Sequence, residues 1–174
     1  MSPEPAPAGR SQKSRSTGRS RSSVAPLVRT AEPGDLDRLV ELEQRCFTGD
    51  QISRRSFRRL LTRDSALTLI ADQGYLMLLF RAGSKVARIY SVAVAAEARG
   101  RGLGRELIRA GERWAQARAC ESIQLEVRVD NEAAIGLYES LGYHVFGRIA
   151  GYYEEDGADA LRLRKSLIAK EPHA

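Results

Sequence analysis

Cysteines and long apolar runs are both scarce in this chain of 174 residues. The two cysteines, Cys46 and Cys120, lie in unrelated segments, and no Cys/Cys or Cys/His spacing matches a metal site. We therefore expect reduced thiols and no structural metal. No stretch approaches the ~18 consecutive apolar residues that span a bilayer, and the N-terminus lacks the apolar segment of a secretory signal. These absences predict a soluble, cytoplasmic protein with no membrane contact.

The remaining composition is typical of one folded domain. A chain of this length with 43% apolar residues can form one hydrophobic core. The formal net charge is +6, but residues 1–26 contain five basic residues and one acid. The rest of the chain contains 23 basic and 21 acidic residues. The charge therefore belongs mainly to the N-terminal segment and does not indicate a nucleic-acid-binding domain.

Residues 1–26 are rich in Ser, Arg, Pro and Gly, and Met1 supplies their only large apolar side chain before Val24. Such a segment buries too little apolar surface to order itself, so we expect a disordered basic tail. Three interpretations stay open: an inert solvated tail, non-specific contact with nucleic acid or another polyanion, and a targeting segment. We assign residues 27–168 to the domain and residues 169–174 to a C-terminal tail.

Apolar spacing and turn residues predict a mixed α/β (α+β) fold for residues 27–168. A short strand over 27–30 precedes a helix that follows Pro33 and Gly34, and Ser53 is placed to cap a second helix. Strand patterns over 66–96 indicate an antiparallel meander. The later elements are a helix over 102–117, a strand over 122–129, a helix over 131–141, and strands over 143–149 and 158–165. The predicted order is β-α-α-β-β-β-α-β-α-β-β.

A glycine-rich turn joins the strand that ends at Val94 to the helix that begins near Gly102. Backbone N–H groups at the start of a helix, where its dipole is positive, favour a phosphate ligand, and glycine permits close approach. The turn lacks a dinucleotide fingerprint, because Arg105 occupies the third glycine position, and it lacks the Lys-Ser/Thr of a P-loop. A phosphate site of another kind is predicted, the alternative being a turn that merely connects two elements.

A second constellation follows in residues 122–141. Apolar and polar side chains alternate along the strand, which places Glu126 on the face opposite the apolar series. Asn131 and Tyr138 are seven residues apart on the next helix and therefore project in nearly the same direction. Other interpretations stay open for each: a salt-bridged surface glutamate for Glu126, a helix cap for Asn131 and a core aromatic for Tyr138.

These two segments together resemble the GNAT superfamily of N-acetyltransferases. Arg99, Gly102 and Gly104 match the Arg/Gln-x-x-Gly-x-Gly/Ala pyrophosphate loop of that family. The run Leu-Glu-Val-Arg-x-x-Asn-x-x-Ala-Ile-x-Leu-Tyr over residues 125–138 is similar to RimI-type ribosomal-protein-alanine N-acetyltransferases. The resemblance is strong over residues 90–163, weaker before them and absent from the tail.

The resemblance implies an acetyl-CoA-dependent N-acetyltransferase with a GNAT-like fold and no metal. Glu126 would be the general base for the amine, directly or through a water, and Tyr138 would protonate the departing thiolate. A backbone N–H near Val94 would polarise the thioester carbonyl. The positions implied to bind acetyl-CoA are Val92, Ala93, Val94, Arg99, Gly100, Arg101, Gly102, Leu103, Gly104, Arg105 and Asn131.

The acceptor implied by the resemblance is a protein or peptide N-terminal α-amine, with a ribosomal protein among the candidates. Asp130 stands where the RimI type commonly has Ser, and residues 47–53 lack its Pro-Trp-Ser. A lysine side chain or a small-molecule amine therefore stays open as acceptor, as does a non-catalytic acyl-CoA-binding or ribosome-associated module. The five arginines between Arg54 and Arg63 either attract an acidic substrate or form a solvated helix face.

Overall fold

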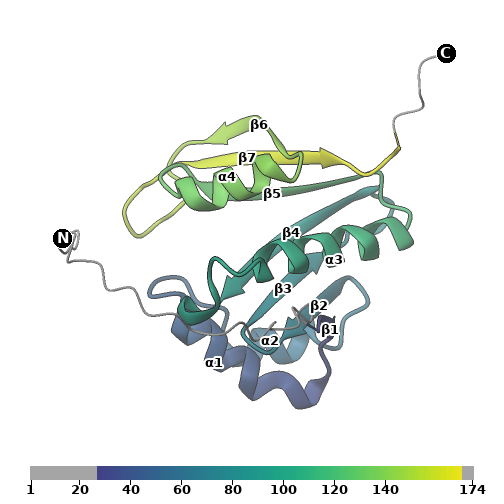
Figure 1. The fold of residues 1–174 in the computed structure, drawn as a ribbon, viewed down its shortest axis with the longest axis vertical. Helices are drawn as coiled ribbons and strands as arrows, with labels where there is room; N and C mark the ends of the chain where they lie inside the picture. The colour runs from purple at the N-terminus through teal and green to yellow at the C-terminus, as the bar shows by residue number, and fades with distance from the viewer. Residues whose placement is uncertain (1–26, 170–174) are drawn as a thin grey trace, which may run out of the picture.

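The computed structural model describes residues 27–169, which form a seven-stranded sheet with helices on both faces (Figure 1). The predicted order of helices and strands is confirmed, and two 3-10 turns, η1 and η2, are additional to it. The expected tail over residues 1–26 lies outside the described residues, so the proposed division of the chain stays a prediction. The elements are β1 (Arg29–Thr30), η1 (Pro33–Asp35), α1 (Leu36–Cys46), α2 (Arg54–Leu60), β2 (Ala66–Ala71), β3 (Gly74–Leu79), β4 (Val86–Val94), η2 (Ala96–Ala98), α3 (Leu103–Ala117), β5 (Ser122–Arg128), α4 (Glu132–Ser140), β6 (His144–Ile149) and β7 (Ala160–Ser166).

The strands lie in the order β1-β2-β3-β4-β5-β7-β6, and every neighbouring pair is antiparallel except β4 and β5. The predicted meander is confirmed as β2, β3 and β4. The helices α1 and α2 pack against β2, β3 and β4, whereas α3 packs against the opposite face of β2 to β5. Within residues 27–169, no helix combines the length and the apolar composition needed to cross a membrane.

Two hydrophobic clusters fix the helices to the two faces of the sheet. Leu107 and Ile108 of α3 are fully buried in one cluster, and Leu39 of α1 and Phe57 of α2 are fully buried in the other. Burial of each such side chain contributes about 1.5–3 kcal/mol. Ser53 caps α2 as predicted, because its side chain accepts a hydrogen bond of 3.1 Å from the backbone N–H three residues later.

The two central strands β4 and β5 pair over only three residues and then separate. Their register ends at Arg88 opposite Gln124, although β4 continues to Val94 and β5 to Arg128. The pairing of β4 with β3 contains a bulge, because Leu78 faces Ile89 while Met77 faces Ser91, which leaves Tyr90 as an extra residue. A bulge bends its strand and increases its twist. The side of β4 that would have faced β5 is therefore open from Ile89 onward.

Candidate active site

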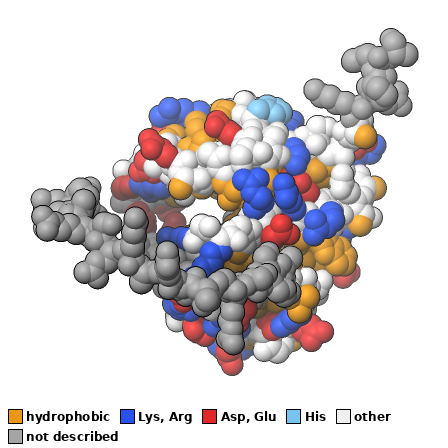
Figure 2. All heavy atoms as spheres, in the orientation of Figure 1, with side chains coloured by type: hydrophobic (Ala, Val, Ile, Leu, Met, Phe, Trp, Pro, Cys, Tyr) orange, Lys and Arg blue, Asp and Glu red, His pale blue; other side chains and the backbone are white. Residues whose placement is uncertain are grey.

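A cavity of about 710 Å³ lies where β4 and β5 separate. Figure 2 shows the surface hollowed between the part built on β2 to β4 and the part built on β5 to β7. The cavity brings the end of α1, the open end of β4, the glycine turn and α4 together. Its lining residues are Cys46, Phe47, Val92, Ala93, Val94, Ala98, Arg99, Gly100, Gly102, Leu103, Gly104, Arg105, Ile108, Asn131, Ala133, Ala134, Leu137 and Tyr138.

The glycine turn has the backbone conformation that its sequence predicts. Gly100 and Gly102 have φ values of 74° and 85°, in the left-handed region where a side chain is disfavoured. Gly102 is the N-cap of α3 and offers no side chain to the first-turn N–H groups. Those groups and the positive end of the helix dipole face the cavity end lined by Gly102 and Gly104. This end of the cavity therefore fits an anion such as a pyrophosphate.

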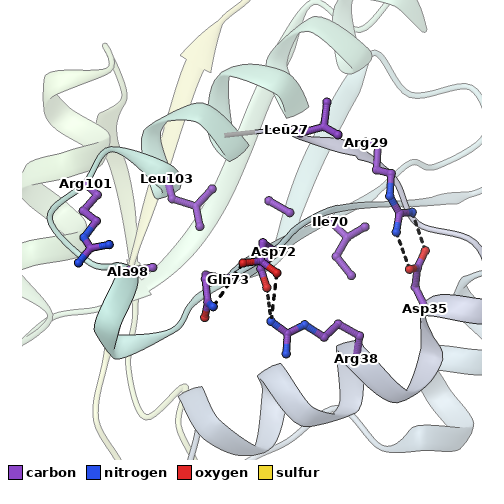
Figure 3. A pocket seen from close by; sticks show the side chains of 11 residues that line it. Leu27, Arg29, Asp35, Arg38, Ile70, Asp72, Gln73, Ala98, Arg101 and Leu103 are labelled. Carbon is purple, nitrogen blue, oxygen red and sulfur yellow. Dashed lines mark hydrogen bonds and ion pairs between the residues drawn. The ribbon is translucent and has the colours of Figure 1, made fainter. Parts of the chain in front are cut away.

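The three arginines of the turn are placed differently. Arg99 lines the cavity and donates from Nε to the carbonyl oxygen of Val94 at 3.1 Å. Arg105 also lines it and donates to Ser140 Oγ at 2.9 Å, which links α3 to the end of α4. Arg101 lines a neighbouring cavity of about 560 Å³ instead. In that cavity the Arg101 side chain is on the side away from two ion pairs, Arg29 with Asp35 and Arg38 with Asp72 (Figure 3).

Glu126 lies on β5 with its side chain only 10% exposed. Its Oε2 accepts a hydrogen bond of 2.9 Å from Arg88 Nε, and its Oε1 is 3.9 Å from Arg162 Nε. Arg88 also donates to the Tyr152 hydroxyl at 3.1 Å. The alternation along β5 predicts the face of Glu126 correctly; the residue is salt-bridged, as the alternative interpretation has it, but it is not a surface residue. Glu126 is not among the residues that line the 710 Å³ cavity.

Tyr138 and Asn131 line the cavity from α4. Tyr138 is 7% exposed and packs edge-on against Tyr143, with ring centroids 5.3 Å apart. Burial raises the pKa of the Tyr138 phenol, which therefore keeps its proton at neutral pH. Among residues 27–169, none accepts a hydrogen bond from this hydroxyl. The Asn131 side chain caps α4 by accepting from the Ala134 N–H at 3.2 Å, as the capping interpretation predicts.

Glu126 and Tyr138 lie on opposite faces of the sheet. Tyr138 belongs to the α3 cluster together with the odd-numbered residues of β5, whereas Glu126 projects to the other face, on which α1 and α2 lie. The separation of β4 from β5 opens a passage between these faces, since the cavity is lined both by Phe47 after α1 and by Tyr138. The two side chains therefore approach one gap from its two sides.

Two features of the site escape sequence reasoning. The first is Arg88, which sequence analysis does not identify as a site residue. Its position between the apolar Ala87 and Ile89 does indicate that its side chain projects from the face of β4 opposite to theirs. The other is Glu43 of α1, which is 2% exposed and accepts hydrogen bonds from the Ile52 N–H at 2.7 Å and from the Tyr75 hydroxyl. Burial and this carboxylate raise the pKa of Tyr75. The network anchors the segment between α1 and α2 beside the cavity.

Known proteins resemble this chain in sequence and in fold. The profile of the acetyltransferase (GNAT) family matches residues 36–143. The chain is 35% identical over 148 residues to the uncharacterised protein ML0378 of Mycobacterium leprae, a match that spans 80% of this chain and 40% of that protein. It is 32% identical over 139 residues to the N-alpha-acetyltransferase RimI of Mycobacterium tuberculosis, spanning 75% and 86% of the two chains. The ribosomal-protein-S18-alanine N-acetyltransferase from Escherichia coli has the same fold, with a TM-score of 0.74 at 24% identity over 86% and 99% of the chains.

The matched region contains the elements that build the cavity, from α1 through the glycine turn to α4. Acetyl-CoA fits this arrangement, because the open edge of β4 offers unpaired backbone groups and the glycine turn offers an anion site. Since the family profile covers more than half of the chain, the chain belongs to the GNAT family and is an acetyl-CoA-dependent N-acetyltransferase.

Proposed function

We propose that this chain transfers the acetyl group to the N-terminal α-amine of a protein or peptide. The observation that carries the proposal is the passage between β4 and β5, which has a glycine turn at the start of α3 on one side of the sheet and a carboxylate on the other. The relative from M. tuberculosis is named an N-alpha-acetyltransferase, which supports the same acceptor. An α-amine, with a pKa near ~8, is neutralised more easily than a lysine near ~10.4.

The residues proposed to hold acetyl-CoA fall into two groups. The N–H groups of Gly102 to Arg105 would bind the pyrophosphate, with Arg99 and Arg105 close enough to add charge. The open backbone of β4 from Val92 to Val94 would pair with the pantetheine amides in the manner of an added strand. Asn131 retains a side-chain N–H₂ beyond its capping bond and would donate to the same arm.

Glu126 is proposed as the general base. Arg88 binds Oε2 and so fixes the orientation of the carboxylate, which leaves Oε1 to take the ammonium proton directly or through a water. The small exposed fraction of the side chain keeps most bulk water away from this oxygen. Acetyl-CoA supplies an activated acyl group when bound, and the residues on this side of the gap would neutralise the amine and position it.

Residues on the opposite side of the gap are proposed to stabilise the negative charge that develops on the acyl oxygen and on the sulfur. A backbone N–H near Val94 would donate to the acyl oxygen. Tyr138 would donate to the departing sulfur, since its hydroxyl has no acceptor among residues 27–169 and its raised pKa keeps it protonated. Because the raised pKa makes the phenol a weaker acid than a thiol near ~8.5, Tyr138 would act chiefly by donating a hydrogen bond that stabilises the departing thiolate.

A comparison of acceptors tests the proposal. Release of free coenzyme A would be measured with the full chain, acetyl-CoA and three acceptors: a peptide with a free α-amine, the same peptide with a blocked α-amine and one internal lysine, and spermidine. A ribosomal-protein N-terminal peptide belongs in the first group. We expect turnover with free α-amines to exceed the other two by about tenfold or more, as the difference in amine pKa favours. Preference for lysine or spermidine would overturn the assigned acceptor.

A further inference from the structure

Arginines and other polar side chains lie in register on one face of β4, β5, β7 and β6. Arg88 pairs with Gln124, Gln124 pairs with Arg164, and Arg164 pairs with His144, so the four form one row. Directly paired residues project from the same face of a sheet. In the next row Glu126 pairs with Arg162. We call Arg88, His144, Phe146, Arg162 and Arg164 the arginine face.

This face is not covered by a helix of the described chain. The alternate residues of β5 and β7, such as Leu125 and Leu163, are buried in the α3 cluster, so the arginine face points the other way. On that side α1 and α2 pack against β2, β3 and β4, and no helix of residues 27–169 packs similarly on β5, β7 or β6. The side chains of Arg88 and Arg162 are 36% and 37% exposed.

The charges on this face do not balance. Two arginines, Arg88 and Arg162, flank Glu126, which is the only carboxylate that pairs with either of them among residues 27–169. Arg164 donates to the neutral Gln124 side chain at 2.9 Å, and its Nε is buried without a partner among the same residues, so no carboxylate balances its charge there. Guanidinium groups are strong, forked donors for carboxylates. The face therefore has an excess of positive charge directly beside the proposed base.

We propose that the arginine face binds acidic side chains of the acceptor polypeptide, so that preferred acceptors carry Asp or Glu shortly after the reacting amine. This inference rests on the proposed function. An amine placed at Glu126 lies beside Arg162, and Arg164 is two residues farther along β7, about 7 Å away. An extended acceptor spans that distance with about two residues. Acidic side chains at the second to fourth positions would meet the face.

A polypeptide suits this face better than a nucleic acid. Phe146 lies on the edge strand β6, and the guanidinium carbons of Arg162 and Arg164 lie 4.7 and 4.4 Å from its ring centroid. Nucleic-acid-binding platforms stack bases on open rings, whereas this ring already carries two cations.

Matched peptides test the inference. The full chain would be assayed with Ala-Asp-Glu-Glu and Ala-Asn-Gln-Gln peptides of otherwise identical sequence, and the ratio of their kcat/KM values would be compared between proteins. We expect the acidic peptide to be preferred about tenfold, the scale of one hydrogen bond between charged groups, and the preference to fall with added salt. Arg164→Gln should remove most of this preference. The matched control Arg148→Gln on β6 should retain it, because Arg148 pairs with Asp159 and projects from the other face.

A binding measurement separates this inference from the proposed function. Fluorescence anisotropy would follow a labelled acidic peptide with a blocked α-amine, with a short single-stranded RNA as competitor. Arg164-dependent peptide binding without any acetylation of peptide amines would support the face and overturn the proposed acceptor. Acetylation with equal kcat/KM for both peptides would overturn this inference alone. Stronger binding of the RNA than of the peptide, lost on Arg164→Gln, would identify this face as a nucleic-acid surface and also overturn the inference.

Discussion

The two oxygens of the Glu126 carboxylate have different surroundings. Oε2 is held by Arg88 at 2.9 Å, while Oε1 lies 3.9 Å from the nearest nitrogen of Arg162. A carboxylate fixed by one oxygen keeps the other for a proton. The alternating pattern of β5 predicts where Glu126 points, but not its partner. Arg88 is 38 residues earlier, and the two meet only because β4 pairs with β5 at that register.

Replacing Glu126 by Gln should lower turnover by roughly 10²-fold, the usual scale of general-base catalysis. Glutamine still accepts a hydrogen bond from Arg88, so calorimetric affinity for acetyl-CoA should stay unchanged. The loss should shrink between pH 6 and pH 9, because an acceptor α-amine with a pKa near ~8 loses its proton unaided over that range. The raised pKa of Tyr138 keeps its phenol protonated throughout, so Tyr138 adds no titration of its own.

Steady-state rates with a single α-amine peptide across that pH range would provide the measurement. Full activity of Glu126→Gln at every pH would mean that another carboxylate, such as Glu154 in the loop before β7, accepts the proton.

At the scale of the elements, the conformation of the glycine turn can be predicted from its sequence, whereas the bend in β4 cannot. The spacing of Gly100, Gly102 and Gly104 between a strand and a helix predicts a tight turn at a helix start, and the positive φ values of the first two agree. The bulge at Tyr90 has no local signal, because it arises from the register of β4 against β3. The placement of β7 between β5 and β6 likewise depends on pairing between distant segments.

Replacing Gly102 by Val should weaken acetyl-CoA binding by about tenfold or more. A β-branched residue is strained at a φ of 85°, and its side chain would stand where an anion approaches the N–H groups of α3. Gly83→Val is the matched control, since Gly83 has a φ of 75°, similarly open surroundings and a place in the turn between β3 and β4. Isothermal calorimetry and melting temperatures would be measured for both.

Both variants should lose comparable thermal stability, but only Gly102→Val should lose affinity. If the two variants bind acetyl-CoA equally well, the turn does not hold the pyrophosphate.

For the whole molecule, the distribution of charge and apolar residues predicts which part of the chain forms the core. The helical and strand periods of residues 27–168 identify the buried faces of α1, α2 and α3, because burial selects one side of each element. Strand order and the acceptor surface could not be predicted in this way. Both depend on which strands become neighbours, and the row from Arg88 to His144 joins residues that are 56 positions apart.

Deleting residues 1–26 should leave turnover on short peptides within about twofold. The segment has too few large apolar side chains to contribute to a core, so we propose that residues 27–168 fold without it. Circular dichroism melting and the coenzyme A release assay would compare the shortened and full chains. Loss of folding or of acetyl-CoA affinity in the shortened chain would assign the segment to the domain.

Because β4 leaves β5 after three paired residues, the two halves of the sheet are joined there by few hydrogen bonds. The packing of α3 against both halves supplies the rest of the connection. A ligand that pairs with the open edge of β4 and contacts α4 would act as a removable strand between them. Binding to the folded state raises the free energy of unfolding by RT ln(1 + [L]/Kd), and amides along the gap would gain the most protection from hydrogen exchange. The free energy of unfolding would thus rise each time acetyl-CoA binds and fall each time coenzyme A dissociates.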